Sequence, residues 1–168
     1  MDFIPPGPHQ AAWETLMGPE GLMWQEMSAA LRTFDPHVHL VRVENGVGTG
    51  TPDVNGCVVG VEWWAELKGL RSWKSVPDTR VMTLEHDLLP SQRAWLRARY
   101  IAGGNAWVIL GVREPKEWLI WEGWRAAEVI GNSTRLELIA ATALHALGAF
   151  PVLKWVTLLR RFRPTVAL

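Results

Sequence analysis

The sequence of 168 residues has a single cysteine and no net charge, with 17 basic and 17 acidic side chains. One cysteine, Cys57, excludes an internal disulfide and a zinc site made of several thiolates, and it fits a reducing compartment such as the cytoplasm. Balanced charge provides no overall basic field that would attract nucleic acid, so any such contact has to come from local patches.

Long hydrophobic runs are also absent. Residues 1–10 are broken by prolines and lack the basic start of a secretory signal. The most apolar late stretch, residues 136–153, is interrupted by His145 and Pro151 and carries Glu137, which is too broken a pattern to span a bilayer. We therefore expect no membrane contact and a cytoplasmic protein.

Tryptophan, in contrast, is unusually frequent, with 11 residues. Large aromatic side chains dominate protein cores and interfaces, so we expect most of these residues to fill the core and an interaction surface. A platform on which nucleic-acid bases stack is the alternative.

The spacing of apolar residues predicts one α+β domain over residues 1–168, three-layered and α/β/α-like, with a mixed sheet. Trp24, Met27 and Leu31 share one face of the first predicted helix. A helix between the third and fourth strands would make those two strands parallel if they pair. The predicted order is helix 19–32, strands 39–44, 54–59 and 61–67, a linker over 69–89, helix 90–101, strands 105–112 and 117–121, and helices 134–147 and 152–162.

Two motifs on neighbouring predicted strands carry the chemistry, a Pro-Asp pair at Pro52-Asp53 and the triplet Glu66-Leu67-Lys68. Glu66 and Lys68 are two residues apart on one strand, so their side chains leave from the same face. Carboxylate and carbonyl oxygens suit a hard divalent cation such as Mg²⁺, which can polarise a phosphate and activate a water. A lysine beside the ion can hold that water or stabilise developing negative charge. The motifs therefore predict a site for a metal ion and a phosphodiester.

The position of the hairpin turn decides whether the two carboxylates meet. A turn at Gly60-Val61 sets Asp53 opposite Lys68 and makes Glu66 its diagonal neighbour, within reach of a shared ion. Asn55-Gly56 is a favoured turn dipeptide, and a turn there would leave Glu66 about 26 Å away along the strand. We expect the later turn because it leaves two strands of matched length. A surface ion pair between strands is the alternative interpretation of these charges.

Four short segments around these motifs resemble the PD-(D/E)xK nuclease superfamily, namely RVEN at 42–45, GTPDV at 50–54, WAELK at 64–68 and LPSQ at 89–92. Within that superfamily, the chain is most similar to small stand-alone VRR-NUC-type and Holliday-junction-resolvase-like nucleases of phages and bacteria. The similarity covers roughly residues 20–112 and leaves the tryptophan-rich, helical extension over residues 113–168 without a counterpart.

The resemblance implies a restriction-endonuclease-like αβββαβ core, over about residues 19–112, that binds Mg²⁺ or Mn²⁺. It implies that Asp53, Glu66 and the Leu67 carbonyl are metal ligands and that Lys68 is catalytic. Gln92 would be a further catalytic residue at the start of the helix beside the site, and capping of that helix is its alternative role. An acid from the first helix would join the metal, with Glu20 favoured over Glu26, and a surface acid that stabilises the helix dipole is the alternative role of Glu20.

Two functions from different classes follow. The first is a metal-dependent DNA endonuclease, structure-specific for branched DNA such as a Holliday junction, acting as a homodimer in the cytoplasm or, if a phage encodes it, in the host cytoplasm. Arg71, Lys74 and Arg93 would then contact DNA, with a solvated loop as the alternative for the first two. The second is a non-catalytic DNA-binding or protein-interaction module with a tryptophan-rich contact surface.

Overall fold

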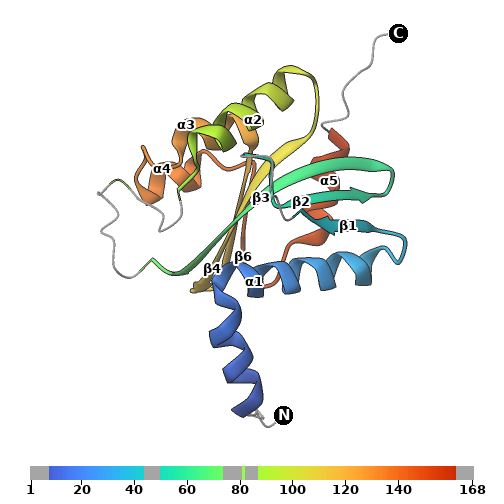
Figure 1. Ribbon diagram of the computed structural model, residues 1–168, viewed down its shortest axis with the longest axis vertical. Helices are drawn as coiled ribbons and strands as arrows, with labels where there is room; N and C mark the ends of the chain where they lie inside the picture. The colour runs from blue at the N-terminus through green and yellow to red at the C-terminus, as the bar shows by residue number, and fades with distance from the viewer. Residues whose placement is uncertain (1–7, 44–49, 74–80, 82–86, 162–168) are drawn as a thin grey trace.

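The computed structural model describes residues 8–43, 50–73, 81 and 87–161 (Figure 1). Its elements, in chain order, are α1 Pro8–Phe34, β1 His39–Arg42, β2 Val54–Val58, β3 Val61–Ser72, α2 Pro90–Ile101, β4 Ala106–Glu114, β5 Glu117–Glu122, α3 Gly123–Val129, α4 Arg135–Ala140, β6 Leu144–Leu147 and α5 Val152–Arg161. None of the helices in these described ranges has the length and apolar character needed to cross a bilayer.

The six strands form one sheet in the order β1-β2-β3-β4-β5-β6. Neighbouring strands are antiparallel except β3 and β4, which are parallel and are connected through α2. This is the expected consequence of a helical connection between paired strands. The α+β class, the mixed sheet and the parallel pair are therefore confirmed.

Each face of the sheet carries its own apolar cluster. Strand β4 shows the division, because Trp107 and Ile109 join the cluster with α1 and α5, whereas Val108 and Leu110 join the cluster with α2, α3 and α4. Alternate residues of a strand point to opposite faces, so a strand covered on both sides is apolar throughout. Figure 1 shows α2, α3 and α4 together on one side of the sheet.

Helix α1 is bent where its second segment begins. Gly18 has a positive φ of 66° and is followed by Pro19, which cannot continue the hydrogen bonding of the preceding helix. The second segment packs on β3 at Gly69, where an added Cβ would lie 2.4 Å from the Glu20 nitrogen. The bend and this close approach together bring Glu20 against the strand that carries the Glu66 motif.

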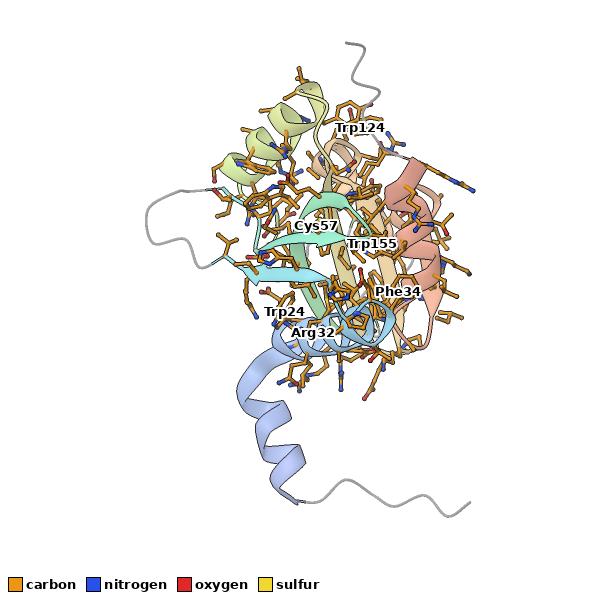
Figure 2. All side chains as sticks on the ribbon, turned by 90° about the vertical axis from the view of Figure 1, so that its right-hand side faces the viewer. Trp24, Arg32, Phe34, Cys57, Trp124 and Trp155 are labelled. Carbon is orange, nitrogen blue, oxygen red and sulfur yellow. The ribbon has the colours of Figure 1, made fainter. Side chains whose placement is uncertain are left out.

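Most tryptophans fill the core, as expected. Among the ten whose side chains are described, six are buried, namely Trp63, Trp73, Trp107, Trp118, Trp121 and Trp155. Trp155 of α5 makes edge-to-face contacts with Trp63 and Trp107, at ring centroid distances of 5.5 and 5.1 Å. Figure 2 shows Trp155 inside the layer between α5 and the sheet. Such pairs add to the stabilisation from burial.

The predicted helix over residues 134–147 is wrong. Helix α4 begins at a capping box of Thr134 and Glu137 and ends after one and a half turns, with the Ala141 amide bonded back to the Glu137 carbonyl. The following Leu144–Leu147 segment pairs with β5 as strand β6. Because β5 is buried on both faces, its outer edge has backbone groups that need partners, and this requirement outweighs the helical pattern.

Two shorter differences concern the connections. The predicted linker over residues 69–89 begins later, since β3 continues to Ser72 and Trp73 is buried. Helix α3 was not predicted, because seven residues are too few for a helical period to stand out. Helix α2 has the bounds that the sequence predicted.

Trp155→Ala should lower the free energy of unfolding by about 3–5 kcal/mol, because it removes a fully buried indole and its two edge-to-face contacts. Leu153→Ala on the same helix is the control, since Leu153 is 71% exposed and should change stability by less than about 0.5 kcal/mol. Urea unfolding followed by tryptophan fluorescence measures both. Equal effects of the two substitutions would contradict the packing described.

Candidate active site

The hairpin between β2 and β3 fixes which residues face each other. Its turn lies at Val59 and Gly60, which have positive φ values of 47° and 77°, and it sets Val58 opposite Val61. Two consecutive left-handed residues match the twist of the strands in a two-residue turn. A β-branched residue rarely adopts a positive φ, so Val59 provides no sequence signal for this turn.

The predicted turn at Gly60-Val61 is therefore wrong by one residue, and the strand pairing changes with it. Val54 pairs with Ala65, and continuing this register places Asp53 opposite Glu66 rather than opposite Lys68. The alternative turn at Asn55-Gly56 is wrong, because both residues lie inside β2. Gly56 serves packing instead, since an added Cβ would lie 2.3 Å from the indole of its cross-strand partner Trp63.

Asp53 lies directly before the first residue of β2. Its Oδ2 accepts a hydrogen bond of 2.8 Å from the Leu67 amide, and its own carbonyl accepts one of 2.7 Å from the Val43 amide. The N–H and C=O of one strand residue point to the same side. The Leu67 carbonyl is thus directed to the side of β3 on which the Asp53 carboxylate lies.

Glu66 is the most unusual side chain of the site, because it is a carboxylate with only 1% of its surface exposed. Its Oε1 receives Lys68 Nζ at 2.9 Å and Gln92 Nε2 at 2.5 Å. Its Oε2 is buried and has no hydrogen-bond partner among the described residues. A buried, unpaired carboxylate oxygen is costly unless a ligand supplies the missing contact.

The surroundings of Glu66 disfavour its ionised form. Burial and, second, the neighbouring Asp53 carboxylate raise the pKa of Glu66 from 4.5 to about 7, with a smaller contribution from Glu20. The Lys68 ammonium lowers this pKa but does not offset the other contributions. A divalent cation between the carboxylates would favour their ionised forms and reverse the shift.

Helix α2 lies along β3 and supplies Gln92. Within this helix, Gln92 contacts Glu66, Trp95 contacts Trp64 with ring centroids 5.5 Å apart, and the next turn carries Arg99, which is 3.5 Å from a Glu62 oxygen. Residue numbers in these contacts rise along α2 and fall along β3, so the helix runs antiparallel to the strand and its first turn lies over Glu66.

The two roles considered for Gln92 are compatible. Its Oε1 accepts a hydrogen bond of 2.9 Å from the Leu89 amide at the start of α2, while its Nε2 donates to Glu66. The approach of Gly50 reinforces this arrangement, since an added Cβ there would lie 2.6 Å from the Ser91 backbone. The segment that precedes Asp53 and the start of α2 are therefore in direct contact.

Of the two first-helix acids, the structure brings Glu20 towards the site. Glu20 Oε1 is 3.0 Å from Arg42 Nη2, and its charge contributes to the raised pKa of Glu66. Glu26 instead lies 2.8 Å from Lys116 Nζ, which belongs to the β4–β5 connection. Glu20 is therefore the acid of the first helix whose charge acts on Glu66, and Glu26 is paired elsewhere.

The three predicted DNA-contacting residues differ in their surroundings. Arg71 is exposed near the end of β3, and Lys74 lies outside the described residues. The Arg93 guanidinium donates to the carbonyls of Ala127 at 2.6 Å and Ile130 at 2.9 Å and is paired with Asp87. Arg93 therefore joins α2 to the end of α3, which leaves it poorly placed for a phosphate.

A second buried carboxylate, which was not predicted, lies on this face of the sheet. Glu117, 2% exposed, accepts hydrogen bonds from Trp73 Nε1 at 2.5 Å and shares a 2.6 Å contact with His145 Nε2. Arg135 lies over the Trp73 ring at 5.1 Å from its centroid. This network holds Trp73, which begins the connection to α2. An acidic residue at the start of an otherwise apolar strand was the only available signal.

The donor set fits a hard divalent cation with an incomplete protein shell. In the described ranges, no cluster of three or more histidine, cysteine, aspartate or glutamate side chains is arranged to hold a metal ion. Asp53, Glu66 and the Leu67 carbonyl instead provide two carboxylates and one main-chain oxygen. Mg²⁺ commonly binds one or two carboxylates and keeps several waters, so this set matches its chemistry better than that of zinc.

Comparison of the chain with protein-family models, with curated proteins and with solved structures finds no match.

The raised pKa of Glu66 predicts a pH-dependent stability of the metal-free protein. The folded state retains a proton on Glu66 up to about pH 7, whereas the unfolded state releases it near pH 4.5, so stability should fall as pH rises between these values. The loss is at most roughly 3.5 kcal/mol, because the pKa differs by about 2.5 units and one unit corresponds to about 1.4 kcal/mol.

Glu66→Gln should remove this component, since an amide does not titrate. Urea unfolding in the presence of chelator, at intervals from about pH 5 to about pH 8, measures the free energy of unfolding of the two proteins. The wild type should lose stability relative to the variant as pH rises and then level off. The difference in stability between the two proteins at each pH removes the contribution of the histidines, which both share. A difference that does not change with pH would contradict the raised pKa of Glu66.

Proposed function

We propose that this protein is a Mg²⁺- or Mn²⁺-dependent endonuclease that hydrolyses DNA phosphodiester bonds with a PD-(D/E)xK-type site. The observation that carries the proposal is the buried Glu66, which lies opposite Asp53, has Lys68 and Gln92 on one oxygen, and has no described partner on the other. A structural ion pair would need only Glu66 and Lys68, and it would leave the second acid unexplained.

Each residue then has a distinct task. Asp53, Glu66 and the Leu67 carbonyl would hold the cation, and Glu20 would complete the acidic side of the site through a bound water. The cation, when bound, polarises the scissile phosphate and lowers the pKa of a water. Lys68 would orient the attacking water and stabilise the negative charge that develops on the phosphate. Gln92 would keep the Glu66 carboxylate in place, with its second oxygen directed to the ion.

The order of elements supports the finer architecture in this proposal. The chain runs α1-β1-β2-β3-α2-β4, which is the αβββαβ order expected of a restriction-endonuclease-like core. Helices pack on both faces of the sheet through the two apolar clusters. Residues 113–161 complete the sheet with β5 and β6 and cover it with α3, α4 and α5, so this part of the chain packs on the same sheet as the core.

The alternative, a non-catalytic module with a tryptophan-rich contact surface, has less support. No tryptophan belongs to the exposed large hydrophobic residues in the described part of the chain. A contact surface of this kind needs several exposed aromatic side chains close together. We include action on branched DNA, a homodimer and a cytoplasmic location in the proposal, on the strength of the sequence resemblance.

Cleavage of a labelled four-way junction and of its matched duplex tests the proposal, with Mg²⁺ and with chelator. Lys68→Ala should lower the rate by about 10²–10³-fold, as removal of a charge-stabilising group does at preorganised sites. Lys116→Ala is the matched control, because Lys116 is an exposed lysine paired with Glu26 on another part of the sheet. Its rate should equal that of the wild type.

The substrates separate the parts of the proposal. Cleavage of the junction without the duplex would support branched DNA as the substrate, whereas equal cleavage of both would contradict that specificity. Binding of both substrates without Mg²⁺-dependent cleavage would contradict the nuclease and favour the binding module. An equal loss of activity in both lysine variants would contradict the role of Lys68.

A further inference from the structure

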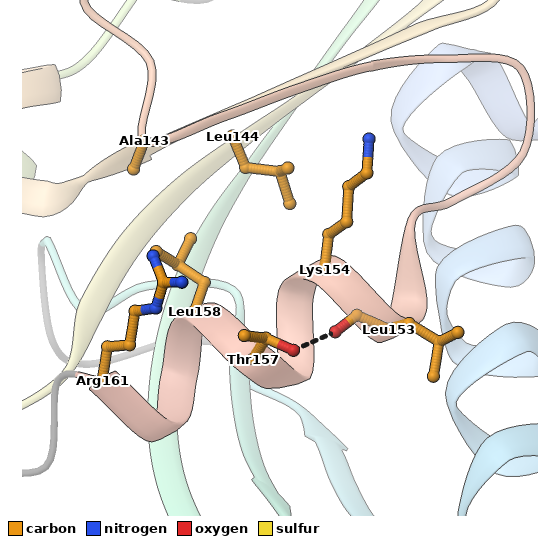
Figure 3. Close-up of a pocket in the computed structure, with 7 residues that line it drawn as sticks. All are labelled: Ala143, Leu144, Leu153, Lys154, Thr157, Leu158 and Arg161. Carbon is orange, nitrogen blue, oxygen red and sulfur yellow. Dashed lines mark hydrogen bonds between the residues drawn. The ribbon is translucent and has the colours of Figure 1, made fainter.

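A groove lies on the opposite side of the sheet from Glu66, at the edge formed by β6. It has a volume of about 310 Å³ and lies between β6 and α5, lined by Ala143, Leu144, Leu153, Lys154, Thr157, Leu158 and Arg161 (Figure 3). The α5 residues follow the spacing of one helix face, and the other face packs in the core through Trp155, Val156 and Leu159. The groove therefore presents a helix stripe that no described element covers.

Strand β6 leaves an open backbone edge beside this stripe. It is the last strand in the sheet order, so its outer edge has no strand partner among the described residues. Its sequence, LHAL, contains no proline or lysine, which commonly protect sheet edges from pairing. Leu153 and Leu147 flank the edge and are 71% and 70% exposed. Such an edge is suited to accepting an added strand.

The charge of the groove specifies the chemistry of that strand. Figure 3 shows the Lys154 and Arg161 side chains at opposite ends of the groove, with Leu144 and Leu158 between them. Helix α5 contains no acidic residue, so these cations have no partner within their own helix. Seven helical residues span about 10 Å, and residues i and i+4 of a strand span about 13 Å, which long side chains can match.

We propose that this groove binds an extended, acidic peptide segment of a partner protein, which adds to β6 as a further strand. Its residues i and i+4 are acidic and meet Lys154 and Arg161, while an apolar residue at i+2 contacts Leu144 and Leu158. Main-chain hydrogen bonds to the β6 edge supply affinity, and the side chains supply specificity.

Two other occupants fit the groove less well. A second copy of the chain, paired through β6 about a two-fold axis, would bring its Lys154 and Arg161 against the same residues of the first copy, and like charges facing each other are unfavourable. Nucleic acid would leave the apolar floor and the strand edge without suitable partners, because its contacts are made mainly with phosphates.

Fluorescence anisotropy with two labelled peptides tests the proposal on the full chain. The acidic probe is Thr-Glu-Thr-Val-Thr-Glu-Thr, and the matched basic probe is Thr-Lys-Thr-Val-Thr-Lys-Thr. The acidic probe should bind at least about tenfold more tightly. A variant carrying Lys154→Glu and Arg161→Glu should reverse this preference, and it should fold normally because both side chains are exposed. Arg160→Glu is the control, since exposed Arg160 does not line the groove, and it should leave the preference unchanged.

Equal binding of the two probes, or no binding of the acidic probe at up to about 1 mM protein, would overturn the proposal. So would an equal effect of Arg160→Glu and the double variant, because that would indicate a general response to charge. Light scattering that shows a dimer from which the acidic probe is excluded would favour a second copy instead. A duplex oligonucleotide that displaces the probe would favour nucleic acid.

Discussion

The burial of the Glu66 carboxylate is the constraint on which the site depends. A carboxylate that is 1% exposed requires compensation, and Lys68 and Gln92 supply it on one oxygen only. The Asp53 carboxylate increases the imbalance instead of reducing it, since its charge raises the pKa of Glu66. The cation proposed for this site would offset the imbalance, because a nearby positive charge favours the ionised form of both carboxyl groups.

The sheet converts this local constraint into a property of the whole domain. Glu66 and Lys68 lie on β3, which pairs with β2 on one side and with β4 on the other. Strand β2 delivers Asp53 to the site, and the parallel pairing with β4 requires a crossing helix, α2, which delivers Gln92. The apolar clusters on the two faces hold these elements in position. Chemistry and architecture therefore share the same central strands.

The sequence predicted the central part of the fold because its signals there are local. Helix α2 begins at a proline and ends before a Gly-Gly pair, and β3 alternates regularly, so both were found. Strand β6 could not be predicted, because four residues of an edge strand have no period of their own and pairing with β5 decides their structure. The same holds for α3, which is too short to show a helical face.

The Pro-Asp and Glu-x-Lys motifs proposed Asp53, Glu66 and Lys68 for the candidate site, and the structure brings these three residues together. Their register could not be predicted, because the turn lies at Val59 and valine rarely adopts a positive φ. The choice between Glu20 and Glu26 and the internal role of Arg93 also depend on contacts between distant segments. Glu117 and His145 were not connected for the same reason, since they meet only through the pairing of β5 with β6.

The most direct test of the central claim is a calorimetric titration with Mn²⁺ of the wild type, Asp53→Asn and Glu26→Gln. We expect saturable binding by the wild type and by Glu26→Gln, and at least about a tenfold loss of affinity in Asp53→Asn, because that variant removes one of the two carboxylate ligands. Equal affinity of Asp53→Asn and the wild type, or no binding by the wild type, would show that the paired carboxylates do not form a metal site.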